Sequence, residues 1–397
     1  MSVSRLHHIP GFSIDRVAAA VGNDPDVLRL ENLDTDLAPP QAALVATRDA
    51  LESLSNPRTR TGANSYLPFS GDDDLRAHVA RRVNQDAGTA YTSENVVITC
   101  GATEGMLDAL LAMTNPGDEV ILTDPTYAGM IYRARLVGCT TRFVPFYSEK
   151  GPEGKAWRLD LDALRAAITR RTRVVFLMNP SVPTGAVLSE GEWQAVSEIC
   201  CEHGVWLLYN AAMERILYDD RPLIHPAGFE DMPERTVTVG SVSKEFRMIG
   251  WRIGWVIAPF SLVEDIKRVH IYNVVTPTGI SQPGACAALS TTGDRLEDVV
   301  SVWQQRRDVV SEQLEAYGSI PAAGGWSQLL DVDMLGFDSF KASRLLLERG
   351  LVAATPMRDW GENNGNRFVR IVFSNEPVER LSLLGERVRL ALGEPVA

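Results

Sequence analysis

The stretch 241–255 reads Ser-Val-Ser-Lys-Glu-Phe-Arg-Met-Ile-Gly-Trp-Arg-Ile-Gly-Trp and follows the strand-like run 236–240. Its lysine, Lys244, carries an amine that can form an imine with an aldehyde. Hydroxyl and guanidinium groups close to such a lysine can hold a phosphate. The candidate phosphate ligands in this stretch are Ser241, Ser243 and Arg252. The stretch therefore predicts a site for a phosphorylated aldehyde cofactor at the end of a strand.

The composition is that of an ordinary globular protein. The chain has 397 residues, of which 45% are hydrophobic and 23% charged, and this length suits two domains. The net charge of −12 argues against nucleic-acid or anionic-membrane partners, because both need a basic face. The first ten residues lack the apolar core of a signal peptide, and no apolar run approaches the ~20 residues of a membrane helix.

The cysteines and histidines show no spacing typical of a disulfide framework or a metal site. The five cysteines are odd in number, and the six histidines have no metal-ligand pattern. We therefore expect reduced cysteines in a cytoplasmic protein and no metal. The cysteines are Cys100, Cys139, Cys200, Cys201 and Cys286.

Short apolar runs alternate with helical segments through the middle of the chain. This alternation predicts a mostly parallel sheet with both faces covered, whose ligands bind at the carboxyl ends of the strands. The remaining chain, from about residue 291, predicts a long charged helix over 295–317 and then an α+β pattern. The expected strands of the sheet are 96–100, 119–123, 172–178, 206–209 and 236–240.

Three loops after these strands carry polar or aromatic residues. Gly101-Ala102-Thr103 opens a helix, whose free N–H groups can bind phosphate, although many helices begin this way. The turn 124–127 ends in Tyr127, which is either a packed aromatic or a flat surface for a flat cofactor. The loop 179–185, Asn-Pro-Ser-Val-Pro-Thr-Gly, is a rigid turn that begins with Asn179.

Together these segments closely resemble the fold-type I pyridoxal-phosphate enzymes of the aminotransferase class I/II family, over roughly residues 28–390. The resemblance implies an α/β fold with a large domain built on a mostly parallel sheet and a smaller α+β domain. It also implies pyridoxal 5′-phosphate as cofactor and an amino acid as substrate. The domain limits that we expect are 1–45 for an N-terminal segment joining the small domain, 46–290 for the large domain and 291–397 for the small domain.

The resemblance also implies a role for each cofactor-binding residue. Lys244 forms the imine and, once the substrate displaces it, serves as base and acid at the substrate Cα. Tyr127 stacks on the pyridine ring, Asn179 donates to the phenolic oxygen, and Asn210 lies at the pyridine nitrogen. The residues that the resemblance assigns to phosphate binding are Gly101, Ala102, Thr103, Ser241, Ser243 and Arg252.

An arginine in the strand-like run 367–374 is the candidate for substrate binding. A buried arginine needs an anion, and the resemblance assigns Arg370 to the substrate carboxylate; a structural ion pair is the alternative. Arg367 points to the opposite side by strand alternation. The run 30–37 contributes Asn32 and Leu33 to the substrate pocket.

The segment 64–71 resembles one in which a tyrosine reaches the phosphate of the partner subunit. If so, Tyr66 makes the protein a homodimer with shared active sites. The alternative is a surface aromatic residue near a turn.

Several positions depart from the family pattern: Asn210, Met213, Ala211, the residue before Asp34, and Met357, where a glycine is common. Family members carry an aspartate where this chain has Asn210, and a neutral amide cannot stabilise a protonated pyridine nitrogen by charge. Met213 replaces a tyrosine that contacts the phenolic oxygen. These departures indicate either tolerated drift in an ordinary aminotransferase or retuned ring electronics.

The expected activity is transamination between an amino acid and a 2-oxo acid. The alternative is a lyase that performs β-elimination, or an oxidative decarboxylating deaminase of a specialised biosynthetic route. A transcription regulator of the same fold would need about 100 further residues for DNA binding, whereas the family-like segment here begins within ~30 residues and the chain is acidic.

Overall fold

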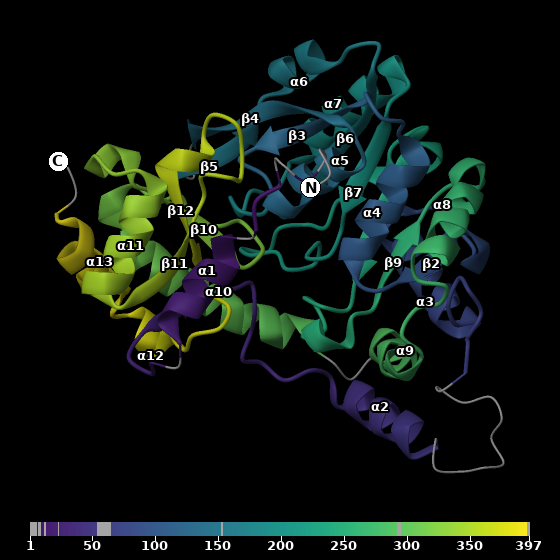
Figure 1. Cartoon of the computed structure of the whole chain (residues 1–397), viewed down its shortest axis with the longest axis horizontal. Coiled ribbons are helices and arrows are strands. Elements are labelled where there is room, and N and C mark those ends of the chain that lie inside the picture. The colour runs from purple at the N-terminus through teal and green to yellow at the C-terminus, as the bar shows by residue number, and fades with distance from the viewer. Residues whose placement is uncertain are drawn as a thin grey trace.

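Two separate β-sheets organise the computed structural model, and Figure 1 shows them side by side. The structure describes residues 6, 9–11, 13–22, 24–53, 65–151, 154–291 and 295–394. One sheet has eight strands in the order β2-β9-β8-β7-β6-β3-β4-β5, and the other has four in the order β1-β11-β12-β10. We call the corresponding parts of the molecule the eight-stranded half and the four-stranded half.

The eight-stranded sheet is parallel through its centre. β3 pairs in parallel with β4 and β6, and β6, β7 and β8 continue the parallel order. β9 is antiparallel to both β2 and β8, so β2 and β8 run in the same direction. The strands are β2 (Val96–Thr99), β3 (Glu119–Asp124), β4 (Thr140–Gly151), β5 (Gly154–Leu159), β6 (Thr172–Met178), β7 (Trp206–Asn210), β8 (Thr236–Ser241) and β9 (Gly254–Ile257).

This topology confirms the predicted α/β architecture and adds three strands that the sequence did not reveal. β9 and the β4–β5 hairpin were not among the expected strands, whereas the other five lie within one or two residues of their expected limits. Because β2, β3, β6, β7 and β8 share one direction, their carboxyl ends meet at one edge of the sheet.

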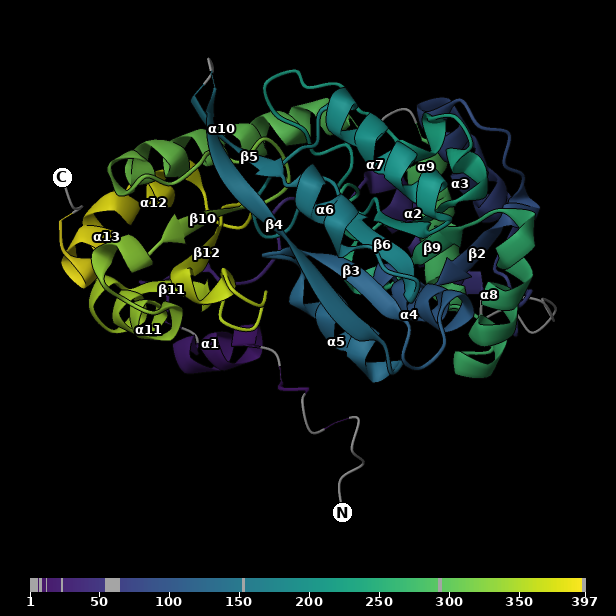
Figure 2. The same cartoon turned by 90° about the horizontal axis from the view of Figure 1, so that it is seen from above.

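Helices cover both faces of the eight-stranded sheet, as Figure 2 shows. Side chains alternate between the faces: Val120 and Leu122 of β3 pack with one helix layer, and Ile121 packs with the other. The first layer consists of α4 (Ala102–Met113), α5 (Ala128–Leu136) and α8 (Phe260–Asn273). The second contains α6 (Leu161–Ala167) and α7 (Glu190–His203), and the outer helices are α2 (Gln41–Ser53), α3 (Asp73–Ala87) and α9 (Gln282–Ser290).

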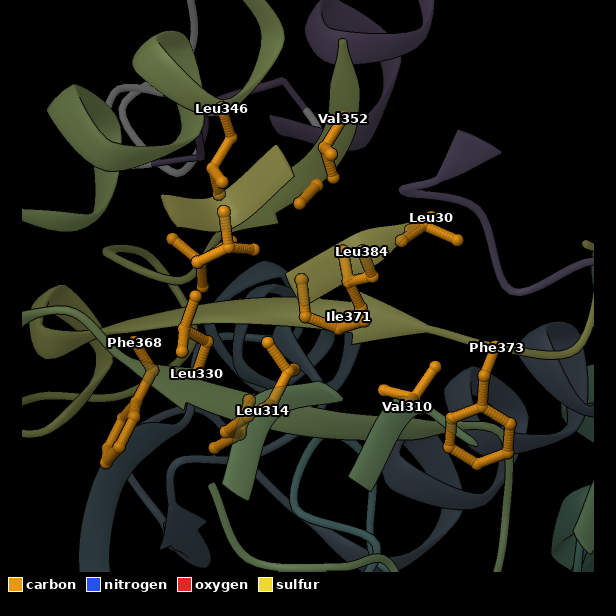
Figure 3. Close-up of a cluster of buried hydrophobic side chains, with 14 of the residues drawn as sticks. Leu30, Val310, Leu314, Leu330, Leu346, Val352, Phe368, Ile371, Phe373 and Leu384 are labelled. Atoms are coloured by element: carbon orange, nitrogen blue, oxygen red, sulfur yellow. The ribbon is translucent and has the colours of Figure 1, made fainter. Parts of the chain in front are cut away.

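The four-stranded half includes the beginning of the described chain. β1 (Leu28–Leu30) pairs in parallel with β11 (Val352–Pro356), so this early strand lies beside elements more than 300 residues later (Figure 1). Figure 3 shows the apolar core between these strands and their helices. The remaining elements are α1 (Ser13–Val21), α10 (Leu296–Leu314), α11 (Ser339–Gly350), α12 (Val378–Leu381), α13 (Leu384–Leu392), β10 (Ser327–Asp331) and β12 (Phe368–Val372). None of the described helices combines the length and apolar character needed to cross a membrane.

Candidate active site

Lys244 lies just beyond the end of β8, between the two halves. Its Nζ donates a hydrogen bond to the carbonyl of Leu33 and lies 4.9 Å from the ring centre of Trp326. Burial lowers the pKa of Lys244 to about 8, although the carboxylate of Asp34 opposes this shift. An amine with this pKa is partly neutral near pH 7, which suits a nucleophile or a base.

The turn after β2 offers a seat for an anion. Gly101 is the N-cap of α4 and makes no side-chain capping bond, so it leaves the N–H groups of the first turn open. A Cβ atom on Gly101 would lie 2.5 Å from Nη2 of Arg252, which places that guanidinium directly beside the turn. Ala102 is partly buried and Thr103 is exposed in the same turn.

Arg252 links this turn to the loop that carries the lysine. Its Nη1 approaches the Oγ of Ser243 at 3.5 Å, and the N–H of Ser243 donates to the Oγ of Ser241 at 3.3 Å. Both serines are buried. A Cβ atom on Gly254 would collide with the backbone at Ala102, so β9 runs tightly against the start of α4. Arg252, Ser241 and Ser243 therefore converge on the turn that holds Gly101, Ala102 and Thr103.

Two buried asparagines follow β6 and β7 with their amide groups oriented. Oδ1 of Asn179 accepts from the N–H of Leu188 at 2.8 Å, and Oδ1 of Asn210 accepts from the N–H of Ala212 at 3.1 Å. The Nδ2 group of Asn210 faces only the sulfur of Met106, at 3.6 Å. Both side chains therefore present Nδ2 as a hydrogen-bond donor, which suits an acceptor on a bound ring.

Arg370 lies fully buried in β12. Its Nη2 donates to the carbonyl of Glu31 and to Oγ1 of Thr355, whereas Nε and Nη1 are buried and have no hydrogen-bond partner among the described residues. No ion pair joins it to a carboxylate in the described part of the chain, and burial lowers its pKa to about 9. A buried guanidinium with unsatisfied donors and no carboxylate partner can bind an anion such as the carboxylate of a ligand.

Aromatic side chains surround these charged groups. Trp360 lies 4.6 Å from the guanidinium carbon of Arg370, and its ring meets that of Tyr127 edge-on at 6.3 Å. Tyr127 follows β3 and caps α5, as its predicted position at a strand end requires. Sequence reasoning missed Trp326 and Trp360. The signals that could have indicated them are the Gly-Gly pair before Trp326 and the Gly after Trp360.

The N-terminal run contributes mostly through its backbone. The carbonyl of Leu33 receives the Lys244 bond, while Nδ2 of Asn32 approaches Oε1 of Glu31 at 3.5 Å. Met213 is buried in the core of the four-stranded half, with its sulfur near Gly325. Apolar packing therefore takes the place of the hydroxyl group that a tyrosine would supply at this position.

One buried group of side chains could hold a metal among the described residues: Glu104, Asp108 and His270. Nδ1 of His270 lies 2.7 Å from Glu104 and 3.4 Å from Asp108. Hydrogen bonds to these carboxylates outweigh burial and raise the pKa of His270 to about 9, so that the ring is positively charged. A charged triad accounts for this cluster.

Tyr66 is 82% exposed, and no described hydrogen bond or ion pair joins it to the residues around Lys244 of its own chain. Its neighbour Asn64 lies outside the described residues.

A model of the family "aminotransferase class I and II" matches residues 26–386. The chain belongs to this family. Among curated relatives, the arginine–pyruvate transaminase of Pseudomonas aeruginosa is 30% identical over 91% of this chain and 90% of its own length. A probable N-succinyldiaminopimelate aminotransferase of Mycobacterium tuberculosis is 31% identical over 88% of this chain and 90% of its own length.

Solved aminotransferase structures have the same fold. The N-succinyldiaminopimelate aminotransferase of Mycobacterium tuberculosis superposes with a TM-score of 0.89 at 29% identity, covering 98% of this chain and 99% of the other. The aspartate aminotransferase of Rhizobium meliloti gives a TM-score of 0.89 at 27% identity and covers both chains completely. The protein is therefore an aminotransferase of the fold-type I class, and its cofactor is pyridoxal 5′-phosphate.

The residues in the structure fit this cofactor. The open helix turn at Gly101 and the adjacent Arg252 suit a phosphate, and the oriented donors of Asn179 and Asn210 suit a ring with a phenolic oxygen and a nitrogen. The amine of Lys244 suits the aldehyde.

Proposed function

We propose that this aminotransferase moves the amino group of an α-amino acid to a 2-oxo acid, with Lys244 as the proton-transfer group and Arg370 as the carboxylate-binding group. The observation that carries the proposal is the pair of unpaired buried donors, Nε and Nη1 of Arg370, in a site whose lysine is partly neutral near pH 7. Both features serve a substrate that has a carboxylate beside the carbon to be deprotonated.

Bound pyridoxal phosphate supplies an electron sink for the carbanion that forms at the substrate Cα. Lys244 removes the Cα proton and returns a proton to the product, which an amine with a pKa of about 8 can do in both directions. Arg370 binds the carboxylate through charge-assisted hydrogen bonds and thereby sets the orientation of Cα. Trp360 and Tyr127 exclude water from that end of the site.

The remaining site residues hold the cofactor. Gly101, Ala102 and Thr103 offer backbone and hydroxyl donors to the phosphate, and Arg252 offers charge. The two serines of the lysine loop complete this cup, Asn179 donates to the phenolic oxygen, and Tyr127 stacks on the ring. Asn210 donates Nδ2 to a ring nitrogen that carries no proton.

The substrate is an α-amino acid, and the relatives span several side chains. Their names specify arginine, N-succinyldiaminopimelate and aspartate. All of these relatives are transaminases, which favours transamination over the lyase and deaminase activities that the neutral Asn210 suggested.

The decisive experiment incubates the cofactor-loaded enzyme with a panel of amino acids in the absence of an acceptor. Transamination predicts that the cofactor changes to its amine form while one equivalent of 2-oxo acid appears, and that added pyruvate restores the aldehyde form. Lys244→Ala is the control that should stop this exchange. Release of ammonia with the aldehyde form regained and no acceptor present would refute the proposal.

A homodimer with shared sites is the second part of the proposal. Large apolar side chains are exposed on two neighbouring segments: Tyr66 and Phe69 on one, and Tyr272, Val275 and Ile280 on the other. The two segments are joined where Oγ1 of Thr276 approaches the carbonyl of Leu67 at 3.4 Å.

This apolar surface adjoins the phosphate seat. Thr278 lies 3.9 Å from the sulfur of Cys100, the residue before Gly101. A second copy covering the surface would bring its Tyr66 close to that seat, and burial of five large side chains favours association.

Sedimentation measures the molecular mass and tests the dimer. The cofactor affinity of Tyr66→Phe tests the shared site. We expect a dimer in which Tyr66→Phe weakens cofactor binding without dissociating the subunits. A monomer with full cofactor affinity would contradict both the dimer and the shared site.

All five cysteines are free thiols, which supports the predicted cytoplasmic location. Cell fractionation tests this location.

A further inference from the structure

Asp124, the last residue of β3, receives a loop from the opposite half of the molecule. The loop spans residues 357–367 and connects β11 to β12. The Asp124 carboxyl is only 2% exposed and accepts the N–H of Asn363 at 2.8 Å and that of Asn364 at 3.4 Å. One carboxyl of the eight-stranded half therefore binds consecutive backbone amides of the four-stranded half.

The loop packs directly against Asp124 and the residues that follow it. The N–H of Thr126 also donates to the carbonyl of Trp360 at 2.8 Å. A Cβ atom on Gly361 would collide with Oδ1 of Asp124. The loop backbone thus wraps around this side chain, and only glycine leaves room for it at position 361.

The same loop carries one wall of the proposed carboxylate site. Trp360 lies between Arg370 and Tyr127, at 4.6 Å and 6.3 Å respectively. Among the described residues, Arg370 donates hydrogen bonds to two acceptors, and both bonds come from Nη2. Packing against Trp360 therefore contributes much of the orientation of the guanidinium. A displaced loop would leave Nε and Nη1 less well directed.

We infer that Asp124 is a positioning residue, a latch between the two halves that fixes the Trp360 loop and through it the direction of the Arg370 guanidinium. This inference rests on the proposed role of Arg370 in substrate binding. The latch acts on the amino-acid carboxylate and not on the phosphate seat, which lies at a different strand end.

Four variants test the latch: Asp124→Ala, the milder Asp124→Asn, Gly361→Ala and the double variant Asp124→Ala with Gly361→Ala. Asp219→Asn is the matched control, because Asp219 pairs with Arg307 away from this loop. Two measurements are made on each cofactor-loaded enzyme. The first measures KM and kcat for the amino acid, together with the affinity for the cofactor. The second measures the rate of tryptic cleavage at Arg358 and Arg367, which are both exposed in the loop.

We expect Asp124→Ala and Gly361→Ala each to raise KM and loop cleavage by about tenfold. The first removes the charge-assisted bonds to the loop, and the second places a methyl group against the Asp124 carboxylate and displaces the loop. Cofactor affinity should stay within about twofold of the parent. The double variant should be no worse than Asp124→Ala alone, since removing the carboxylate makes room for the added methyl group. Asp124→Asn should fall between parent and Asp124→Ala.

The inference is overturned if Asp124→Ala and Asp124→Asn leave both KM and loop cleavage unchanged, if Asp219→Asn raises them equally, or if the two single effects add in the double variant. Loop cleavage reports on the latch even with an enzyme that transaminates none of the amino acids supplied. A failure of the proposed function and a failure of the latch are therefore distinguishable.

Discussion

Arg370 and Arg367 lie three residues apart yet occupy opposite environments. Arg370 is fully buried and retains two unpaired donors, whereas Arg367 is exposed and pairs with Asp331. Arg370 lies within β12, whereas Arg367 ends the short helical turn Gly365–Arg367 that precedes the strand. Because Arg370 is available to a ligand and Arg367 is already paired with Asp331, substitution of the two should have different effects.

Arg370→Gln should lower kcat/KM for the amino acid about 100-fold, because the loss of a buried charge-assisted pair costs about 2–3 kcal/mol. Arg367→Gln, which removes an exposed ion pair, should change it less than about fivefold. Steady-state kinetics on both variants measure this difference. Equal effects of the two substitutions would contradict the assignment of the carboxylate to Arg370.

Gly101→Ala should weaken cofactor binding at least about tenfold, since the new methyl group would press on Arg252 in the phosphate seat. Gly117→Ala is the control: this glycine also has a positive φ, of 94°, but open space around its Cβ position. It should lose stability through backbone strain, about 1 kcal/mol, and keep its cofactor affinity. Equilibrium dialysis measures the dissociation constant of the cofactor for each of the two variants. A normal affinity in Gly101→Ala would remove this turn from the phosphate site.

Lys244→Met should stabilise the cofactor-free protein at pH 7, by on the order of 2–3 kcal/mol. The folded-state pKa of Lys244, about 8, lies below its unfolded value of about 10.4, so the cost of burying the charged amine is fully present below pH 8. Between these two values the unfolded chain binds more protons, and the stability of the parent rises with pH. The advantage of the variant should therefore shrink above pH 8 and vanish above pH ~10.4.

Urea unfolding at a series of pH values measures this effect in the cofactor-free protein. Lys155→Met serves as the control, because Lys155 is exposed and should give a curve parallel to that of the parent. A constant difference between Lys244→Met and the parent across the whole pH range would show that burial does not shift this amine.

Asn210→Asp should accelerate the first half-reaction roughly tenfold, because a carboxylate holds a proton on the ring nitrogen and strengthens the electron sink. Rapid-mixing absorbance with a good amino-acid donor measures the rate. Asn210→Ala, which removes the hydrogen bond without adding charge, should not be faster than the parent. An Asn210→Asp enzyme that binds the cofactor normally and reacts no faster would show that the neutral amide does not limit the reaction.

The sequence by itself determined the chemistry at the strand ends. Lys244, Asn179, Asn210 and the Gly101 turn each follow a buried apolar run, and strands of one direction bring their carboxyl ends to one edge. A short-range pattern was sufficient there, because strand and following loop are contiguous in sequence. The strand-like run 367–374 also favoured Arg370 over Arg367, although Arg367 lies in the helical turn before β12.

Only the tertiary structure decided which side chains complete the site from a distance. Trp326, Trp360 and Asp124 lie far apart in the chain, and no local periodicity relates them. β9 escaped prediction because its antiparallel place between β2 and β8 depends on non-local pairing. Whether a donor such as Nε of Arg370 is left without a partner depends on every neighbour that packing brings within reach, and folding alone fixes that.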